Sequence, residues 1–219
     1  DSDMVVLADD DEISRFVSLM QAKYQLTVRA ILGDGPGNQT SVKILDRYVR
    51  LQVDADGDYV LEYEADPRHA EHLFKELKLE NAKPVATPGV KKDKQDLTSP
   101  ILPKHRHTHY RSLSMRACYL GQDRTDIQFA AKELARDNQA PTEASWTALK
   151  RLGRYLIGRP RVVQIFKHTG EDTSIVSAVV DTDDAGCQKT RKSSTGMVLR
   201  LSLIHISEPT RQAEISYAV

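Results

Sequence analysis

The stretch PTEASWTALKRLGRYLIG, residues 141–158, decides the α-helical part of the expected fold. Pro141 followed by Thr142 is expected to open a helix. The spacing predicts one apolar face, made of Trp146, Leu149, Gly153 and Leu156. The polar side and the end of this helix carry four basic residues, Lys150, Arg151, Arg154 and Arg159.

A second helix is expected just before it. Residues 125–128 (TDIQ) fit a capping box, with Ile127, Ala131 and Leu134 on the buried face. After the helix of residues 141–158, two short apolar runs at 162–166 and 175–180 predict strands.

The segment before these helices has the composition of a linker. Residues 83–103 contain four prolines and several lysines without any hydrophobic period, which predicts a linker or an extended arm. His105, His107 and His109 follow at alternate positions. On a strand they would share a face and could bind a metal, but beside Pro103 and basic neighbours we expect a flexible basic loop.

The first third of the chain predicts a small mixed sheet with helices on one side. Asp66 and Pro67 should open a helix that buries Ala70, Leu73, Phe74 and Leu77. Before this helix we expect a strand at 4–8 (MVVLA), a helix to about residue 24 and a strand at 25–32. A loop at 33–38 should follow, and then two strands, at 42–53 and 59–63, that flank a turn at Asp56-Gly57.

Composition limits the class of protein. With 219 residues and 40% apolar content the chain can form one large or two small domains. No apolar run approaches the length of a membrane span, so we expect a soluble chain without membrane partners. Cys118 and Cys187 lie in no metal-binding pattern and are predicted to be ordinary thiols in a reducing compartment. Because the chain starts at Asp1 without methionine, we expect a fragment.

The net charge of zero hides an asymmetry. Residues 1–66 hold 14 acids and 6 bases, a balance of −8, whereas residues 101–170 hold 13 bases and 5 acids, a balance of +8. A basic half favours a polyanionic partner, and the alternative is a solvated helix face.

Four segments together resemble the polymerase polyproteins of Ty1/copia-type retrotransposons. Residues 83–88 (KPVATP) are similar to the family's KPVSTP step, residues 110–127 to its YRSLVGSLMYLA…RPDI stretch, residues 144–158 to HWKALKRVLRYLKGT, and residues 181–196 to DADWAGC…TRRSTSG. The resemblance implies the closing part of a reverse transcriptase running into a ribonuclease H domain. The implied fold is α/β (α+β), with the end of a palm-like mixed sheet, a helical connection and the first ribonuclease H strands.

The resemblance gives Asp181 a role. In this family the ribonuclease H domain opens on a strand whose aspartate helps to hold two Mg²⁺ ions, which activate water and stabilise the leaving oxygen. Asp183 would share that face only if the strand continued. The alternative is a solvated acidic turn of Asp181, Asp183 and Asp184, and Asp184 stands where the family has Trp.

On the polymerase side the resemblance implies much less. Asp3 could be the second aspartate of the family's polymerase pair, with Ser2 in the place of the first. We therefore expect no primer extension by this chain, and hence an inactive fragment whose parent carries out RNA-directed DNA synthesis and RNA–DNA hybrid cleavage inside the cell, in cytoplasmic particles and the nucleus.

The basic residues of the helix expected at 141–158 suggest which function the fragment retains. Lys150, Arg151, Arg154 and Arg159 would bind the backbone of an RNA–DNA hybrid or other nucleic acid through its phosphates, without reading sequence. The alternatives are a noncatalytic nucleic-acid-binding remnant of the polyprotein and an unrelated interaction module whose basic helix binds an acidic protein.

The end of the chain leaves the family pattern. Residues 201–211 (LSLIHISEPTR) and 215–219 (ISYAV) resemble the translation of a transposase-type DNA sequencing adapter on either side of a variable index. We therefore expect residues 201–219 to be an artefact, so Glu208 and Glu214 are no catalytic candidates. The alternative is a genuine strand at 199–206. The expected division is 1–82 (palm or thumb), 83–103 (linker), 104–170 (helical connection), 171–200 (ribonuclease H start) and 201–219 (artefact).

Overall fold

The fold is known from a computed structural model that describes residues 4–90, 93, 96, 98–167, 176–183, 193–201 and 205–206. Its elements are α1 (Asp10–Gln21), β1 (Ser41–Ile44), β2 (Arg47–Val53), β3 (Tyr59–Ala65), α2 (Arg68–Glu76), α4 (Lys104–Gly121), α5 (Thr125–Arg136), α6 (Glu143–Gly158), β4 (Val163–Lys167), β5 (Val176–Asp183), β6 (Ser194–Leu201) and β7 (His205–Ile206). Helices and strands are mixed along the chain, as expected for an α/β (α+β) protein.

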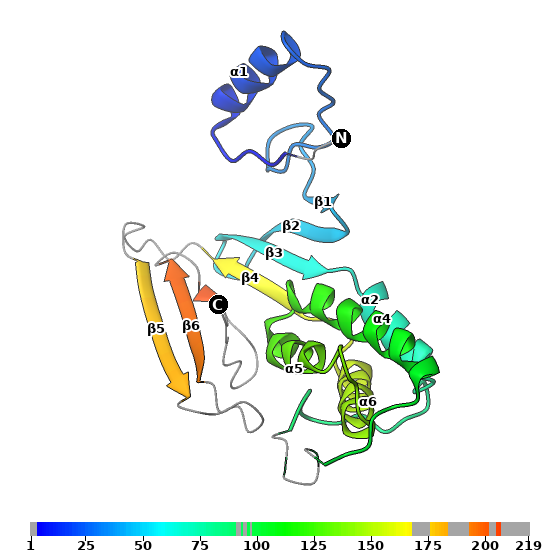
Figure 1. Ribbon diagram of the computed structural model, residues 1–219. Helices are drawn as coiled ribbons and strands as arrows, with labels where there is room; N and C mark the ends of the chain where they lie inside the picture. Colours follow the sequence, from blue (N-terminus) through cyan, green and yellow to red (C-terminus); the bar gives the residue numbers. More distant parts are fainter. Residues whose placement is uncertain are drawn as a thin grey trace.

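The described strands form two antiparallel sheets, so the mixed sheet predicted for the first third of the chain is wrong. The larger has the order β1-β2-β3-β4-β7, and β5 and β6 form a separate hairpin. Helices α2, α4, α5 and α6 pack together at one end of the larger sheet, while α1 lies in a separate N-terminal unit on the other side (Figure 1). Strand β4 follows α6 and returns to pair with β3, so the sheet joins segments about a hundred residues apart.

The hairpin expected at Asp56-Gly57 is confirmed. Gly57 has φ +88°, a conformation that glycine adopts without strain. The Asp54 carboxylate also accepts the backbone N–H groups of Asp56 and Asp58, both at 3.0 Å. The single strand predicted at 42–53 is wrong, because Leu45 and Asp46, with φ of 47° and 62°, form a turn that divides it into β1 and β2.

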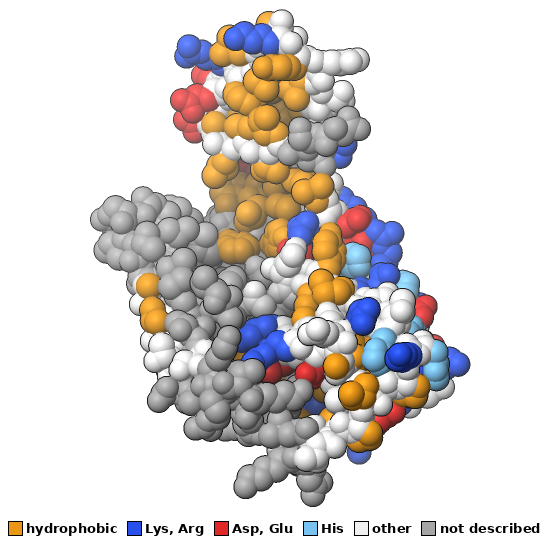
Figure 2. All heavy atoms as spheres, viewed as in Figure 1, with side chains coloured by type: hydrophobic (Ala, Val, Ile, Leu, Met, Phe, Trp, Pro, Cys, Tyr) orange, Lys and Arg blue, Asp and Glu red, His pale blue; other side chains and the backbone are white. Residues whose placement is uncertain are grey.

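The strands predicted at 4–8 and 25–32 are also wrong. Residues 4–8 belong to no described strand, and Leu7 is fully exposed. Within 25–32 only Leu32 forms a bridge, to Gln39. A strand requires a neighbour for its N–H and C=O groups, and no described strand runs beside either segment. Helix α1 is confirmed, but it buries no residue, and Figure 2 shows apolar side chains exposed across this N-terminal unit.

The core of the molecule lies between the four packed helices. It includes the predicted Ala70, Leu73, Leu77, Ile127, Ala131, Leu134, Leu149 and Leu156 together with Tyr110, Leu113, Ala117, Leu120, Leu152 and Tyr155. Phe74 and Trp146 pack against it while partly exposed. Gly153 allows the segment that follows α2 to approach α6, because a Cβ there would lie 2.8 Å from Leu79 Cδ1.

The basic loop expected after Pro103 is wrong, since residues 104–121 form α4. Its buried side chains Tyr110, Leu113, Ala117 and Leu120 recur at helical spacing, and their burial outweighs the polar first turns. His105, His107 and His109 therefore do not share a strand face. The His107 ring lies 2.8 Å from the Leu102 carbonyl oxygen, and the His109 ring packs against Trp146.

The helix starts were predicted with mixed success. The capping box expected at residues 125–128 is wrong: Thr125 is already inside α5, and Arg124 stands at the cap position without capping by its side chain. The helix start expected at Pro141-Thr142 is confirmed, and the structure shows that Thr142 and Ser145 form a capping box there. Helix α2 begins at Arg68, whose N–H is accepted by the Asp66 carboxylate at 2.9 Å.

Candidate nucleic-acid interface and metal-binding aspartate

Asp181 lies within strand β5, opposite Gly196 of β6. The strand predicted at 175–180 is confirmed, and it continues to Asp183, three residues beyond its expected end. By backbone register Asp181 and Asp183 therefore belong to the same face of the hairpin. The Asp181 side chain is exposed.

The described residues alone do not fit a two-metal site. Magnesium needs several oxygen ligands, and two-metal hydrolysis needs a cluster of carboxylates. No group of three His, Cys, Asp or Glu side chains gathers in the part of the chain that the structure describes. Asp3, Asp184, Glu208 and Glu214, as well as the Asp183 side chain, lie outside the described residues. We therefore derive no catalytic step from Asp181.

The four basic residues predicted on α6 do not share one environment. Lys150 and Arg159 are exposed. The guanidinium of Arg159 lies 5.9 Å from the centre of the Tyr155 ring. Arg151 and Arg154 instead hold the proline-rich segment: Arg151 Nη2 donates to Thr87 Oγ1 and Arg154 Nε donates to the Lys83 carbonyl oxygen, each at 2.7 Å.

Helix α4 carries further basic residues, which were expected in a loop rather than on a helix. It contains four Lys or Arg and three His residues and no acid. Arg106 lies over the Trp146 ring, with its Cζ 4.3 Å from the centroid, and also pairs with Glu143 at 3.4 Å. The His109 ring centre is 5.7 Å from that of Trp146.

We call Arg106, His109, Trp146 and Lys150 the α4–α6 basic face. Lys150 follows Trp146 by four residues, so the two side chains lie on one side of α6. Figure 2 shows Lys, Arg and His side chains gathered over the helical part of the molecule. The helical spacing of Tyr110, Leu113, Ala117 and Leu120 was the sequence signal that could have identified α4.

The motif residues that carry the family resemblance mostly hold the helices together. Arg124, 2% exposed, forms an ion pair with Asp126, and its guanidinium also donates to the Arg159 carbonyl oxygen at 3.0 Å. The Tyr155 hydroxyl donates to the same Asp126 carboxylate at 2.8 Å. The buried Tyr110 hydroxyl donates to the Leu134 carbonyl oxygen.

A polar junction joins the sheet to the helices. Asp123 Oδ1 accepts from Arg47 Nε at 2.8 Å and from the Tyr63 hydroxyl at 2.6 Å. Burial and this hydrogen bond raise the pKa of Tyr63 to about 12. Glu64, itself buried, accepts from Arg50 and Arg161, and the hydrogen bond from Arg161 holds the pKa of its carboxyl below the usual range.

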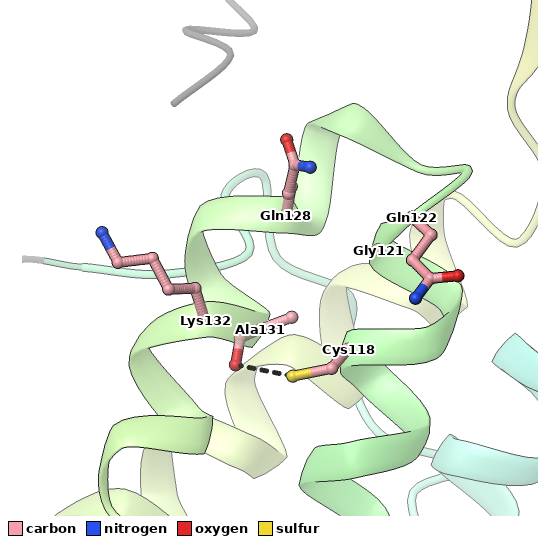
Figure 3. A pocket seen from close by; sticks show the side chains of 6 residues that line it. All are labelled: Cys118, Gly121, Gln122, Gln128, Ala131 and Lys132. Atoms are coloured by element: carbon pink, nitrogen blue, oxygen red, sulfur yellow. Dashed lines mark hydrogen bonds between the residues drawn. The ribbon is translucent and has the colours of Figure 1, made fainter. Parts of the chain in front are cut away.

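A small hollow of about 140 Å³ lies between α4 and α5. Its lining comprises Cys118, Gly121, Gln122, Gln128, Ala131 and Lys132 (Figure 3). The Cys118 thiol donates to the Ala131 carbonyl oxygen, and burial raises its pKa. A thiol with a raised pKa is a poor nucleophile, which agrees with the ordinary thiol expected at this position.

The comparisons with known proteins agree with the motifs. No family model and no solved structure matches the chain. Two similar proteins from Arabidopsis thaliana are the retrovirus-related Pol polyproteins from transposons RE2 and RE1. They are 35% and 34% identical over 140 and 134 residues, which cover 61% of this chain and 9% of each polyprotein. The uncharacterized mitochondrial protein AtMg00810, also from Arabidopsis thaliana, is 29% identical, over 68% of this chain and 61% of its own length.

Over 61% of its length the chain is similar to retrovirus-related Pol polyproteins. The chain is a relative of the Pol polyproteins of Ty1/copia-type retrotransposons, as the four motifs predicted. It spans about a tenth of the length of the polyproteins that it matches. No described helix is long and apolar enough to cross a membrane.

Proposed function

We propose that this chain contributes the nucleic-acid-binding surface of a retrotransposon Pol polyprotein, and that the α4–α6 basic face holds the backbone of an RNA–DNA hybrid. The observation that carries the proposal is the acid-free helix α4, whose Arg106 and His109 pack around Trp146 next to the exposed Lys150. The relatedness to Pol polyproteins supports a nucleic-acid partner over other polyanions.

The chemistry of this face suits phosphates rather than bases. Lys150 would bind a phosphate as a point charge, and Arg106 presents a planar guanidinium that can donate two hydrogen bonds. Its stacking on Trp146 restricts the guanidinium before it binds, which reduces the entropy lost on binding. Arg159 extends the positive charge to the end of α6, whereas Arg151 and Arg154 contribute mainly by holding the segment at residues 83–88.

The finer assignments belong to the same proposal. Residues 1–82 would correspond to the end of a palm-like module, 104–170 to the helical connection and 171–200 to the start of a ribonuclease H-like domain. Asp181, with Asp183 on the same strand face, would be the remnant of its Mg²⁺-binding strand. Asp3 would be the remnant of the polymerase pair. The parent polyprotein would carry out RNA-directed DNA synthesis and hybrid cleavage, and we expect this chain by itself to bind without catalysing either reaction.

Binding can be tested by fluorescence anisotropy with a labelled RNA–DNA hybrid and the full chain. Affinity should fall linearly with salt on a logarithmic scale between roughly 50 and 200 mM. Replacing Arg106 and Lys150 with Gln should weaken binding and make the logarithmic salt slope shallower by about 2, one for each lost phosphate contact. The matched control Lys23→Gln, on the N-terminal unit, should leave both unchanged. A salt-independent affinity, or equal losses in the control, would overturn the proposal.

A competition experiment with polyglutamate distinguishes a nucleic-acid-binding face from the remaining alternative, a site for acidic proteins. Polyglutamate carries negative charge without phosphates or a double-helical backbone. If it displaced the hybrid at the same charge concentration, the face would be a general acidic-protein site, and the proposal would be wrong. A separate primer-extension assay with Mg²⁺ should show no product, and measurable extension would contradict the noncatalytic assignment.

A further inference from the structure

The proline-rich segment after α2 is held against α6 by two arginines. Arg154 Nε donates to the Lys83 carbonyl oxygen and Arg151 Nη2 donates to the hydroxyl of Thr87. Pro84 reaches the end of α6 because Gly158 has no side chain; a Cβ there would lie 3.0 Å from the Cβ of Pro84. Thr87 is therefore placed beside a guanidinium by its own hydrogen bond and by the contacts of Lys83 and Pro84, which precede it.

Arg151 has hydrogen-bonding capacity that this contact does not use. Its Nε is buried and has no hydrogen-bond partner. No described acid lies within ion-pair distance of its guanidinium, in contrast to Arg124, which pairs with Asp126. A buried donor without an acceptor is costly, so an anion arriving next to Thr87 would gain a charge-assisted hydrogen bond.

Thr87 has the features of a modifiable hydroxyl. It is exposed, lies outside every helix and strand, and precedes Pro88. A following proline disfavours helical backbone at Thr87, which keeps the segment extended. A threonine before proline in an extended exposed segment is the form that proline-directed kinases accept.

We infer that Thr87 is a phosphorylation site and that Arg151 receives its phosphate, which fastens the proline-rich segment to α6. The γ-phosphoryl group of ATP is transferred to Thr87 Oγ1 by a proline-directed serine/threonine kinase. The hydroxyl proton goes to the kinase's catalytic base, and ADP leaves. The phosphate adds nearly two negative charges and three acceptor oxygens beside a guanidinium with no described counter-ion. The inference goes beyond the proposed function and needs no nucleic acid.

The chain contains an internal comparison for this site. Ser99 also precedes a proline, but its side chain is partly buried and its hydroxyl already accepts the Ala144 N–H at 3.0 Å. Binding of Ser99 in a kinase active site would break this hydrogen bond at the start of α6. We therefore expect Thr87 to be modified first and to the higher level.

The test uses the full chain, a proline-directed kinase and ATP with Mg²⁺. Mass spectrometry should find phosphate on Thr87 well before Ser99, and Thr87→Ala should remove that signal. Modification of Ser99 alone, or none on a folded chain, would overturn the assignment of the site.

A ³¹P NMR titration then tests the receiving arginine. Arg151 should hold the second pKa of the phosphothreonine below its usual value of about 6, by roughly one unit. Arg151→Lys should retain part of this shift, Arg151→Met should abolish it, and Lys23→Met should leave it in place. Circular dichroism checks that each variant is folded. If Arg151→Met does not fold, Arg151→Lys still tests whether Arg151 lowers the pKa of the phosphate. If the phosphate titrates alike in the parent chain and in the folded Arg151 variants, Arg151 does not receive it.

Discussion

Arg124 and Asp126, only two residues apart, form a two-point ion pair in which Nε and Nη2 donate to the two carboxylate oxygens at 2.8 and 2.6 Å. The same guanidinium donates to the carbonyl oxygens of Arg159 and Pro160, beyond the end of α6. The pair therefore connects the turn between α4 and α5 to the third helix. Both residues lie in one of the family motifs, which assigns that motif to the core of the fold rather than to a reaction.

Removing Arg124 should be strongly destabilising. Arg124→Met would leave the Asp126 carboxylate with only the Tyr155 hydroxyl and leave two carbonyl oxygens without their donor. Losing one partner of a buried ion pair costs about 3 kcal/mol in unfolding free energy. Urea denaturation followed by circular dichroism measures this. The control Lys75→Met removes an exposed pair with Glu71 and should cost less than about 1 kcal/mol. Similar losses in both variants would contradict the role given to Arg124.

Replacing threonine with alanine should have opposite effects on stability at the cap of α6 and inside the helix. Thr142→Ala removes the hydroxyl that accepts the Ser145 N–H and should destabilise the chain by about 1 kcal/mol. Thr147→Ala lies inside the same helix, where the hydroxyl bonds only to the Glu143 carbonyl oxygen. That change should be neutral or slightly stabilising, because alanine has the higher helix propensity. Thermal unfolding of the two variants compares them, and equal effects would be evidence against the cap.

Asp66 should contribute to the loss of stability in acid. The hydrogen bond from Arg68 holds the pKa of this carboxyl well below its usual range. A depressed folded-state pKa means that the contribution is present above about pH 4, the unfolded value, and is lost as the pH falls below it. Unfolding free energy measured from pH 6 down to pH 2 should therefore depend less on pH in Asp66→Asn than in the parent chain.

A second variant keeps the carboxyl and removes its partner. In Arg68→Met the folded-state pKa of Asp66 should rise toward the unfolded value. The acid-induced loss of stability should therefore still begin near about pH 4 but end at a higher pH and be smaller than in the parent chain. Lys43, 3.4 Å from Asp66, still assists the carboxylate, which makes this shift partial. If the loss of unfolding free energy at low pH were unchanged in both variants, Asp66 would not be its cause.

Local patterns were sufficient for much of the fold. Helices α1, α2, α5 and α6 and strands β3, β4 and β5 were predicted from apolar spacing and turn residues, since these signals act within one or two turns of chain. Helix α4 was missed because its first turns are cationic, although its buried residues carry a helical period. The strands predicted at 4–8 and 25–32 failed because an apolar run alone does not provide a pairing neighbour.

For the site, the sequence by itself determined the kinship to Pol polyproteins, the basic character of residues 101–170 and the strand that carries Asp181. Only the tertiary structure decided which cations are available. It places Arg106 and His109 around Trp146 and turns Arg151 and Arg154 toward the segment at 83–88. The physical reason is that charge and helical period can be read along the chain. Whether a guanidinium faces solvent, a carboxylate or a threonine hydroxyl depends on segments far apart in sequence, and only packing brings these together.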